Sequence, residues 1–239
     1  MNILITGGST GLGAAIVLEL SNNKSNNVYF TYSKSIEKAA QLCAANSNIK
    51  AIKCDFTDES SVNNLLSEID SINFDVLINN AIIGFEKQYF HKTAIEVFTN
   101  SFLYNIIPTI KITQAFLLKA RKNKFGKIIN IISSANINKP PIGWSEYVAN
   151  KAYLLSLSNS WATENSRFNI TSNAISPSFM VTNLTSDTDD RIVEQMIESH
   201  PMKKLLTTKE VAETIAFYTT CSQQINGTNL VINAGTDLL

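Results

Sequence analysis

The sequence has few of the residues that mark specialised protein classes. Its three cysteines, Cys43, Cys54 and Cys221, are scattered, form no CxxC pair and are odd in number. This pattern argues against a disulfide framework and is typical of reduced thiols in a cytoplasmic protein. The two histidines, His91 and His200, lie in predicted surface segments without metal-ligand spacing. We therefore expect no metal site.

The sequence also lacks an excess of charge of one sign and lacks long apolar runs. Lys plus Arg equals Asp plus Glu at 20 each, so no bulk attraction to nucleic acid or to an anionic membrane is expected. No apolar run reaches the ~18 residues of a membrane-spanning helix. The N-terminal MNILITGG passes directly into glycines, which predicts a first strand and not a signal peptide. At 239 residues and 44% hydrophobic, the chain fits one domain, residues 1–239.

Short β-branched runs alternate with longer amphipathic runs along the chain. Several short runs are apolar on both faces, as expected for parallel strands covered on both sides. The alternation predicts an α/β fold, a Rossmann-type doubly wound parallel sheet of about seven strands with helices on both faces. The predicted strands are Ile3–Thr6, Asn27–Tyr32, Ile49–Cys54, Val76–Asn79, Lys127–Ile132, Asn169–Ile175 and Leu230–Asn233. The predicted helices are Gly11–Leu20, Ile36–Ala45, Ser60–Ile69, Thr93–Ala120, Ser145–Thr163 and Lys209–Thr219.

A glycine-rich turn, TGGSTGLG, joins the first predicted strand to the first predicted helix. Its glycines Gly7, Gly11 and Gly13 allow a tight turn and a close approach of the backbone to a diphosphate. The helix that begins there offers free N–H groups and the positive end of its dipole. At the start of a strand–helix series, this turn predicts nucleotide binding. Its glycine spacing differs from the GxGxxG of the long two-domain dehydrogenases.

Tyr147 and Lys151 lie four residues apart in SEYVANKAYLLSLS, a stretch rich in helix formers. This spacing puts the two side chains on one helix face. A phenol with a pKa of about 10 exchanges protons poorly at neutral pH, and an adjacent ammonium favours the phenolate and lowers that pKa. The pair is a candidate proton-transfer device. Tyr and Lys also occur at this spacing by chance on solvated helix faces.

Residues 182–200 form the one long segment outside the alternation. The segment is polar, acidic at Asp187, Asp189 and Asp190, and then weakly helical. It is either a solvated surface helix or a lid over a cleft. Its position directly after the end of a predicted strand favours the lid.

The motifs and their order resemble the short-chain dehydrogenase/reductase family, in its single-domain branch, from TGGSTGLG to the final NLVINAG. Two positions depart from the family pattern, because Ile82 and Ser178 replace glycines. The resemblance divides the chain into a cofactor half, residues 1–130, and a catalytic and substrate half, residues 131–239. The matching segments are the cofactor turn TGGSTGLG, CDFTD, NNAI, Asn105 followed by TQAF, KIINIISS, YVANK and SNAISPSFMVTN.

The resemblance implies hydride transfer between a nicotinamide and a carbonyl or alcohol carbon. It implies that Tyr147 is the proton donor in reduction and that Lys151 lowers the pKa of this phenol and holds the cofactor ribose. It also implies that Asn105 supports a water relay from Lys151 to solvent. Asn105 has a structural alternative, because it could cap or kink its helix close to Pro108.

A serine would polarise the substrate carbonyl, and two serines compete for this role. In the family that the chain resembles, this serine usually lies three residues after the polar residue of the fifth strand and about 13 before the tyrosine. The first spacing, counted from Asn130, implies Ser133, whereas the second, counted back from Tyr147, implies Ser134. Strand register is rigid, because a slip of one residue moves a side chain to the other face. The following loop can absorb an extra residue at little cost. Ser133 is therefore favoured, with Ser134 as the alternative.

The resemblance also implies a set of cofactor-binding residues. Three of them could have a purely structural role instead. Asn79 could hydrogen-bond within the sheet, Asp55 could be a turn or N-cap residue, and Pro177 could end a strand. The full set is Gly7, Ser9, Thr10, Gly11, Leu12, Gly13, Ser33, Lys34, Asp55, Phe56, Asn79, Ala81, Tyr147, Lys151, Pro177, Phe179 and Thr182.

The end of the second strand bears on the choice of cofactor. An NAD enzyme of this fold usually carries an acid there, but Tyr32 is followed by Ser33 and Lys34. A hydroxyl and an ammonium attract a 2′-phosphate, which favours NADP (NADPH) over NAD. Thr10 argues the other way, because NADP-preferring relatives often have an arginine there.

The resemblance is to reductases of the 3-oxoacyl-carrier-protein type, which implies a ketoreductase acting on a small-molecule or carrier-bound carbonyl. One alternative is a dehydrogenase of a sugar, polyol or other small alcohol. Another is a non-catalytic nucleotide-binding partner or sensor, suggested by Ile82 and Ser178. A basic cluster could dock an acidic carrier protein, or could be a solvated helix end. Its members are Lys119, Arg121, Lys122, Lys124 and Lys127.

The substrate pocket is predicted from three loops, Ala135–Trp144, Ile83–Tyr89 and residues 182–200. Trp144 and Phe179 suggest apolar surface near the site. By analogy with the family we expect a homo-oligomer, a tetramer or dimer, that pairs through the helical segments 93–120 and 145–163.

Overall fold

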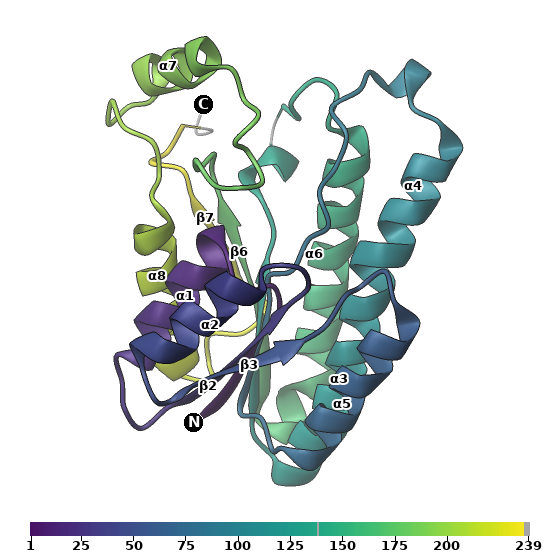
Figure 1. The fold of residues 1–239 in the computed structure, drawn as a ribbon, viewed down its shortest axis with the longest axis vertical. Helices are drawn as coiled ribbons and strands as arrows, with labels where there is room; N and C mark the ends of the chain where they lie inside the picture. Colours follow the sequence, from purple (N-terminus) through teal and green to yellow (C-terminus); the bar gives the residue numbers. More distant parts are fainter. Residues whose placement is uncertain (138, 237–239) are drawn as a thin grey trace.

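The computed structural model describes residues 1–137 and 139–236, and within these residues seven parallel strands form one sheet (Figure 1). The strand order is β3-β2-β1-β4-β5-β6-β7. The chain moves outward in one direction from β1 and then in the other direction from β4, so the predicted doubly wound sheet is confirmed. The predicted strands agree with the observed ones to within two residues at each end. The strands are β1 (Asn2–Ile5), β2 (Asn27–Tyr32), β3 (Ile49–Lys53), β4 (Val76–Asn79), β5 (Gly126–Ile131), β6 (Ile170–Pro177) and β7 (Asn229–Ile232).

Helices cover both faces of this sheet, with α1, α2 and α8 on one face and α3, α5 and α6 on the other (Figure 1). Alternating side chains of each strand supply the two cores, as Ile3 and Ile5 face α1 and α8, whereas Leu4 faces α3 and α5. The α-helices are α1 (Gly11–Ser21), α2 (Ile36–Ala45), α3 (Glu59–Ser71), α4 (Ile95–Ser101), α5 (Ile107–Asn123), α6 (Ser145–Asn165), α7 (Asp190–Ser199) and α8 (Thr208–Thr220). Shorter turns are η1 (Phe90–Lys92), η2 (Phe102–Ile106), η3 (Ser134–Asn136) and η4 (Ser166–Phe168).

The predicted single helix over Thr93–Ala120 is wrong, because the chain forms α4, a π-helical turn at η2 and then α5. Pro108 stands in the first turn of α5 and has no N–H to continue the preceding ladder. Side chains bond to some of the backbone carbonyl oxygens at this irregular turn. The Asn105 amide donates to the Ser101 carbonyl oxygen at 3.0 Å, and the Thr109 hydroxyl donates to the Asn105 carbonyl oxygen at 2.8 Å. Such π turns are frequent at functional sites.

A buried polar network ties the middle of the sheet to the helices on one face. The Asn79 amide donates to Asn130 at 2.8 Å and to Thr113 on α5 at 3.1 Å. The Asn130 amide in turn donates to Ser158 on α6 at 2.9 Å and to Ser172 on β6 at 3.3 Å. These bonds fix α5 and α6 against the strands whose ends form the site described next. Among the helices of the described residues, none combines the length and the hydropathy of a membrane-spanning segment.

Candidate active site

A cavity of about 940 Å³ lies at the carboxyl edge of the sheet, where the ends of the parallel strands meet. Its walls combine the glycine turn, the ends of β2 and β3, the loops after β4 and β5, the start of α6 and the segment after β6. Among the described lining residues, the lysines and carboxylates are Lys34, Lys87, Lys139, Lys151 and Asp55. The excess of positive charge suits a ligand that carries phosphate groups.

The glycine turn is packed so closely that side chains would not fit. Gly7 has a φ of +67°, and a Cβ on it would lie 2.8 Å from the Cα of Ala81. A Cβ on Gly13 would lie 2.1 Å from the Gly7 carbonyl oxygen. At the start of α1, the hydroxyl of the N-cap residue Thr10 makes no capping hydrogen bond within the described residues. The helix therefore presents free N–H groups and its positive dipole end to the cavity.

The predicted cofactor residues come together around this cavity, with one difference. Asn79 does not line it, because its side chain lies in the buried network of β4 and β5. The next residue, Asn80, lines the cavity instead and donates to the carbonyl oxygens of Thr6 and Gly7 at 3.0 and 2.9 Å. The predicted residues that line the cavity are Gly7, Ser9, Thr10, Gly11, Leu12, Gly13, Ser33, Lys34, Asp55, Phe56, Ala81, Tyr147, Lys151, Pro177, Phe179 and Thr182.

The ends of β2 and β3 are joined by side chains. The Ser33 hydroxyl donates to Asp55 at 2.8 Å, and the Asp55 carboxylate also accepts from the backbone N–H and hydroxyl of Thr57 at 2.9 and 2.7 Å. The bonds from Thr57, and then the bond from Ser33, lower the pKa of Asp55. Asp55 thus organises the turn as well as lining the cavity, while the N-cap of α3 is Asp58. Exposed Lys34 lies at the same rim.

Tyr147 lies in the first turn of α6 and is almost fully buried. The ring of Phe85 stacks on it with centroids 4.6 Å apart, and Trp144 contacts it edge-on at 5.5 Å. Burial raises the pKa of Tyr147, and a hydrogen bond with Ser133 acts in the opposite direction. The phenol is therefore held in its protonated form.

Lys151 lies on the same face of α6, with its ammonium 5.8 Å from the centre of the Tyr147 ring. It donates to the Ile131 carbonyl oxygen at 2.6 Å, and burial lowers its own pKa to about 8. The predicted lowering of the phenol pKa by Lys151 is wrong for this structure, because desolvation dominates the pKa of Tyr147.

The two candidate serines occupy different positions. Ser133 is in extended backbone at the end of β5, bonds with Tyr147, and accepts from the Ala135 N–H at 3.1 Å. Ser134 is the first residue of the turn η3. Both line the cavity, but the contact with Tyr147 favours Ser133 as the residue beside a reacting carbonyl.

Asn105 lies outside the large cavity and lines a second one of about 20 Å³ behind Tyr147 and Lys151. Its side-chain oxygen accepts from the Ile83 N–H at 2.7 Å, so it anchors the loop after β4 to the π turn. Glu146 also lines the small cavity. No sequence pattern points to Glu146, because its burial arises from packing between segments that are distant in the chain.

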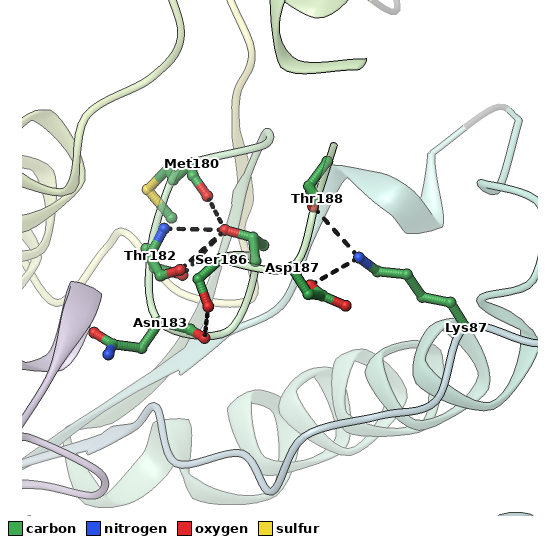
Figure 2. Close-up of polar contacts among 8 residues, drawn as sticks. Lys87, Met180, Thr182, Asn183, Ser186, Asp187 and Thr188 are labelled. Atoms are coloured by element: carbon green, nitrogen blue, oxygen red, sulfur yellow. Dashed lines mark hydrogen bonds and ion pairs between the residues drawn. The ribbon is translucent and has the colours of Figure 1, made fainter. Parts of the chain in front are cut away.

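The segment predicted as a lid follows β6, and its first turn is drawn in Figure 2. The large cavity is lined in part by Thr182, Asn183, Leu184, Thr185 and Thr188 of this segment. The hydroxyl of Thr185 joins its first turn, accepting from the Thr182 N–H at 2.9 Å and donating to the Met180 carbonyl oxygen at 2.7 Å. Lys87, from the loop after β4, reaches across to Asp187 at 3.0 Å and Thr188 at 3.3 Å. This contact joins the two loops on either side of the cavity mouth.

The predicted substrate loops also line the large cavity, although Asn138 within 135–144 lies outside the described residues. Beyond the lid's first turn, α7 supplies Ile192 and Met196 to its wall. These residues are four apart on one helix face, a spacing that the sequence shows only once the helix bounds are known.

A family model described as short chain dehydrogenase matches residues 1–192. The chain belongs to the short-chain dehydrogenase family. It is 30% identical over 237 residues to the 3-oxoacyl-(acyl-carrier-protein) reductase of Haemophilus influenzae, covering 97% of this chain and 96% of that protein. A reductase of the same description from Aquifex aeolicus is 28% identical over 240 residues, covering 97% and 95%.

Solved structures show the same fold. A short-chain dehydrogenase from Burkholderia cenocepacia in complex with NADP has a TM-score of 0.86 at 26% identity, covering 98% of this chain and 96% of that one. A 3-ketoacyl-(acyl-carrier-protein) reductase from Brucella melitensis complexed with NADH has a TM-score of 0.89 at 22% identity, covering 99% and 98%.

The described residues fit the nicotinamide dinucleotide that membership of this family implies. The glycine turn leaves room for a diphosphate beside the free N–H groups of α1. The lysine-rich lining matches its negative charge. Ile82 and Ser178, which depart from the family pattern, line the cavity without closing it.

Proposed function

We propose that this protein is an NADPH-dependent reductase that converts a β-keto acyl or related carbonyl into a secondary alcohol. The observation that carries the proposal is the meeting of Tyr147, Ser133 and Lys151 in one cavity with the glycine turn. A bound reduced nicotinamide would supply the hydride to the carbonyl carbon. The residues of the chain would supply the proton and hold the carbonyl oxygen.

Tyr147 would donate its phenolic proton to the carbonyl oxygen as the alkoxide forms. Burial raises the pKa of Tyr147, which keeps the proton in place until negative charge develops beside it, so the site suits reduction. Ser133, already bonded to this phenol, would donate a hydrogen bond to the same oxygen. Lys151, with a pKa of about 8, remains largely protonated at neutral pH and would stabilise the phenolate left behind.

The preference for NADPH rests on the rim at the end of β2. Ser33 and Lys34 line the cavity there, and the Asp55 carboxylate beside them is bound by Ser33 and Thr57. An ammonium at this rim would attract a 2′-phosphate. Fluorescence titration of the protein with NADPH and NADH would test this. We expect Lys34→Ala to weaken NADPH binding and leave NADH binding nearly unchanged; an equal loss for both would contradict the preference.

An acyl substrate is supported by the apolar part of the cavity lining. It is formed by apolar side chains from three segments: Phe85, Ile142, Trp144, Phe179, Ile192 and Met196. Such a lining suits an aliphatic chain better than a sugar or polyol. The listed relatives named as 3-oxoacyl-(acyl-carrier-protein) reductases support the same substrate class.

The predicted basic cluster does not support carrier docking. Lys127 is buried and donates to the Cys221 carbonyl oxygen, and Lys119 pairs with Asp70. The end of α5 leads into the start of β5, so Arg121 and Lys124 lie at the edge of the sheet away from the cavity (Figure 1).

The deciding experiment mixes the protein with NADPH and a panel of β-keto thioesters, both free and carrier-bound, and follows nicotinamide absorbance. We expect turnover that falls by at least about 100-fold in Tyr147→Phe. Tyr153→Phe is the matched control, because Tyr153 is a half-exposed phenol on the same helix. Tight NADPH binding without turnover across the panel would contradict the proposal and favour a nucleotide-binding sensor.

A further inference from the structure

The small cavity behind Tyr147 and Lys151 has the properties of a water site. Its volume of about 20 Å³ exceeds the ~10–15 Å³ that one water requires. Two of its lining side chains present buried acceptor atoms, Oδ1 of Asn79 and Oε2 of Glu146, that bond to no described residue. Buried acceptors of this kind are commonly satisfied by water. The cavity therefore suits a water molecule on the side of the Tyr–Lys pair away from the large cavity.

Glu146 supplies a buried carboxyl group to this cavity, and the catalytic roles described above give no reason for it. It immediately precedes Tyr147, is 5% exposed, and has no ion-pair partner among the described residues. Its Oε1 accepts from the Asn150 amide at 3.3 Å, and Asn150 also donates to the Ser101 hydroxyl at 2.7 Å. A carboxyl kept from water is costly in its charged form, so a purely structural role would be served as well by an amide.

The charged and titratable groups around Glu146 are few. Within the lining of the small cavity they are Tyr147 and Lys151, both on α6; Asn105 and Thr109, from η2 and α5, are polar and neutral. From outside, the exposed Glu86 acts on it through the loop after β4. Burial and then the negative charge of Glu86 raise the pKa of Glu146 to about 7. Glu146 thus borders the same small cavity as the Tyr–Lys pair, and the exposed Glu86 is near enough for its charge to act on this carboxyl.

We propose that Glu146 is a proton-relay residue, which resupplies the Tyr147–Lys151 pair through a water in the small cavity and exchanges with solvent on the side of Glu86. The inference rests on the proposed reductase function. In each reduction Tyr147 gives one proton to the carbonyl oxygen. The Glu146 carboxyl gives one proton to the cavity water, which passes one to the pair, and the carboxylate is reprotonated from solvent. No electrons move in these steps, and Glu146 touches neither substrate nor cofactor.

The main test is the pH profile of kcat in Glu146→Gln, which keeps the size of the side chain and its contact with Asn150 but cannot titrate. In the wild type we expect kcat for reduction to fall as pH rises through about 7, because only protonated Glu146 delivers a proton. In the variant this inflection should vanish. Below the inflection, kcat should be lower by about tenfold, less than the ~100-fold loss of a group that transfers the proton directly. KM and NADPH affinity should be unchanged.

Two further variants separate the relay from a structural effect. Glu86→Gln removes the neighbouring negative charge, so it should move the inflection to lower pH without removing it. Glu164→Gln, at an exposed position of α6, should behave as the wild type. A readout without turnover is infrared titration of the ligand-free protein. The carbonyl band of a protonated, buried carboxyl should disappear through neutral pH in the wild type and be absent in Glu146→Gln.

The outcomes are distinct. An active wild type whose inflection and rate persist in Glu146→Gln would overturn the relay and leave the reductase proposal intact. A wild type inactive across the carbonyl panel would overturn the reductase proposal and the relay with it. If Glu146→Gln fails to fold, the shift in Glu86→Gln and the infrared band decide. Absence of both would overturn the relay.

Discussion

Lys151 is an ammonium placed where water cannot solvate it, and this has a consequence for stability. Burial lowers the pKa of Lys151 to about 8 in the folded protein, below its ordinary value of 10.5, so between these two pH values the unfolded chain binds more protons. Stability should therefore rise with pH across this window. Below it, burying the charged form costs on the order of 3 kcal/mol. Lys151→Met removes this cost but leaves the Ile131 carbonyl unpaired, at about 1 kcal/mol.

We expect Lys151→Met to raise the melting temperature at pH 7 and to abolish the rise in stability between pH 8 and 10.5. Thermal unfolding over a pH series measures both effects. Lys209→Met, at an exposed position on α8, is the control and should keep the wild-type profile. An unchanged pH dependence in Lys151→Met would contradict the assignment of the rise to this residue.

Gly13 gives a second prediction at this scale. A Cβ there would meet the Gly7 carbonyl oxygen at 2.1 Å, a contact with backbone that no rotamer relieves. We expect Gly13→Ala to lose about 2–3 kcal/mol of unfolding free energy and most of its nucleotide affinity. Gly84→Ala is the control, because no described atom lies within 4 Å of its added Cβ. Equal stabilities of the two variants, measured by denaturant unfolding, would show that the turn can relax.

At the scale of elements, the strands were predictable because parallel strands buried on both faces are short, continuous and apolar. The break in the helical segment 93–120 was not predictable. The spacing of apolar residues does not detect one extra residue in a helical turn, and Pro108 alone does not indicate a π-helix. The glycine turn and the Tyr147–Lys151 pair were found because their chemistry is encoded in local spacing. Asn80 and Glu146 were missed, because their positions depend on contacts between segments distant in the sequence.

Breaking the contact between Lys87 and Asp187 on the lid is expected to change substrate binding but not the stability of the fold. Both Lys87 and Asp187 are solvent-accessible, so water screens their ion pair and it contributes little to the free energy of unfolding. Asp187→Asn should leave the melting temperature nearly unchanged, speed hydrogen exchange over residues 182–199, and raise KM a few-fold. Glu213→Gln, which removes an exposed ion pair on α8, is the matched control. Unchanged exchange in Asp187→Asn would show that the lid is held by other contacts.

At the scale of the whole molecule, apolar side chains remain exposed on the surface of η2, α5 and α6. Leu118 is 68% exposed, Leu103 46% and Tyr153 43%. We propose that a second copy of the chain covers this surface, as the family resemblance implies. Light scattering after gel filtration should give a multiple of the 26.4 kDa chain mass, and Leu118→Asp should reduce that mass. Leu18→Asp, on the exposed side of α1, should leave it unchanged. A monomeric wild type would contradict the proposal.

The glycine turn and the lid also meet directly. A Cβ on Gly11 would lie 3.3 Å from the Cβ of Thr182, so the turn that would seat a diphosphate lies beneath the first residue of the lid. A dinucleotide bound there would be enclosed before any carbonyl compound approached Ile192 and Met196 from the mouth. Turnover would then follow a compulsory order, with the nucleotide first in and last out. Release of the nucleotide would then require residues 182–188 to move, a kind of step that limits turnover in many enzymes.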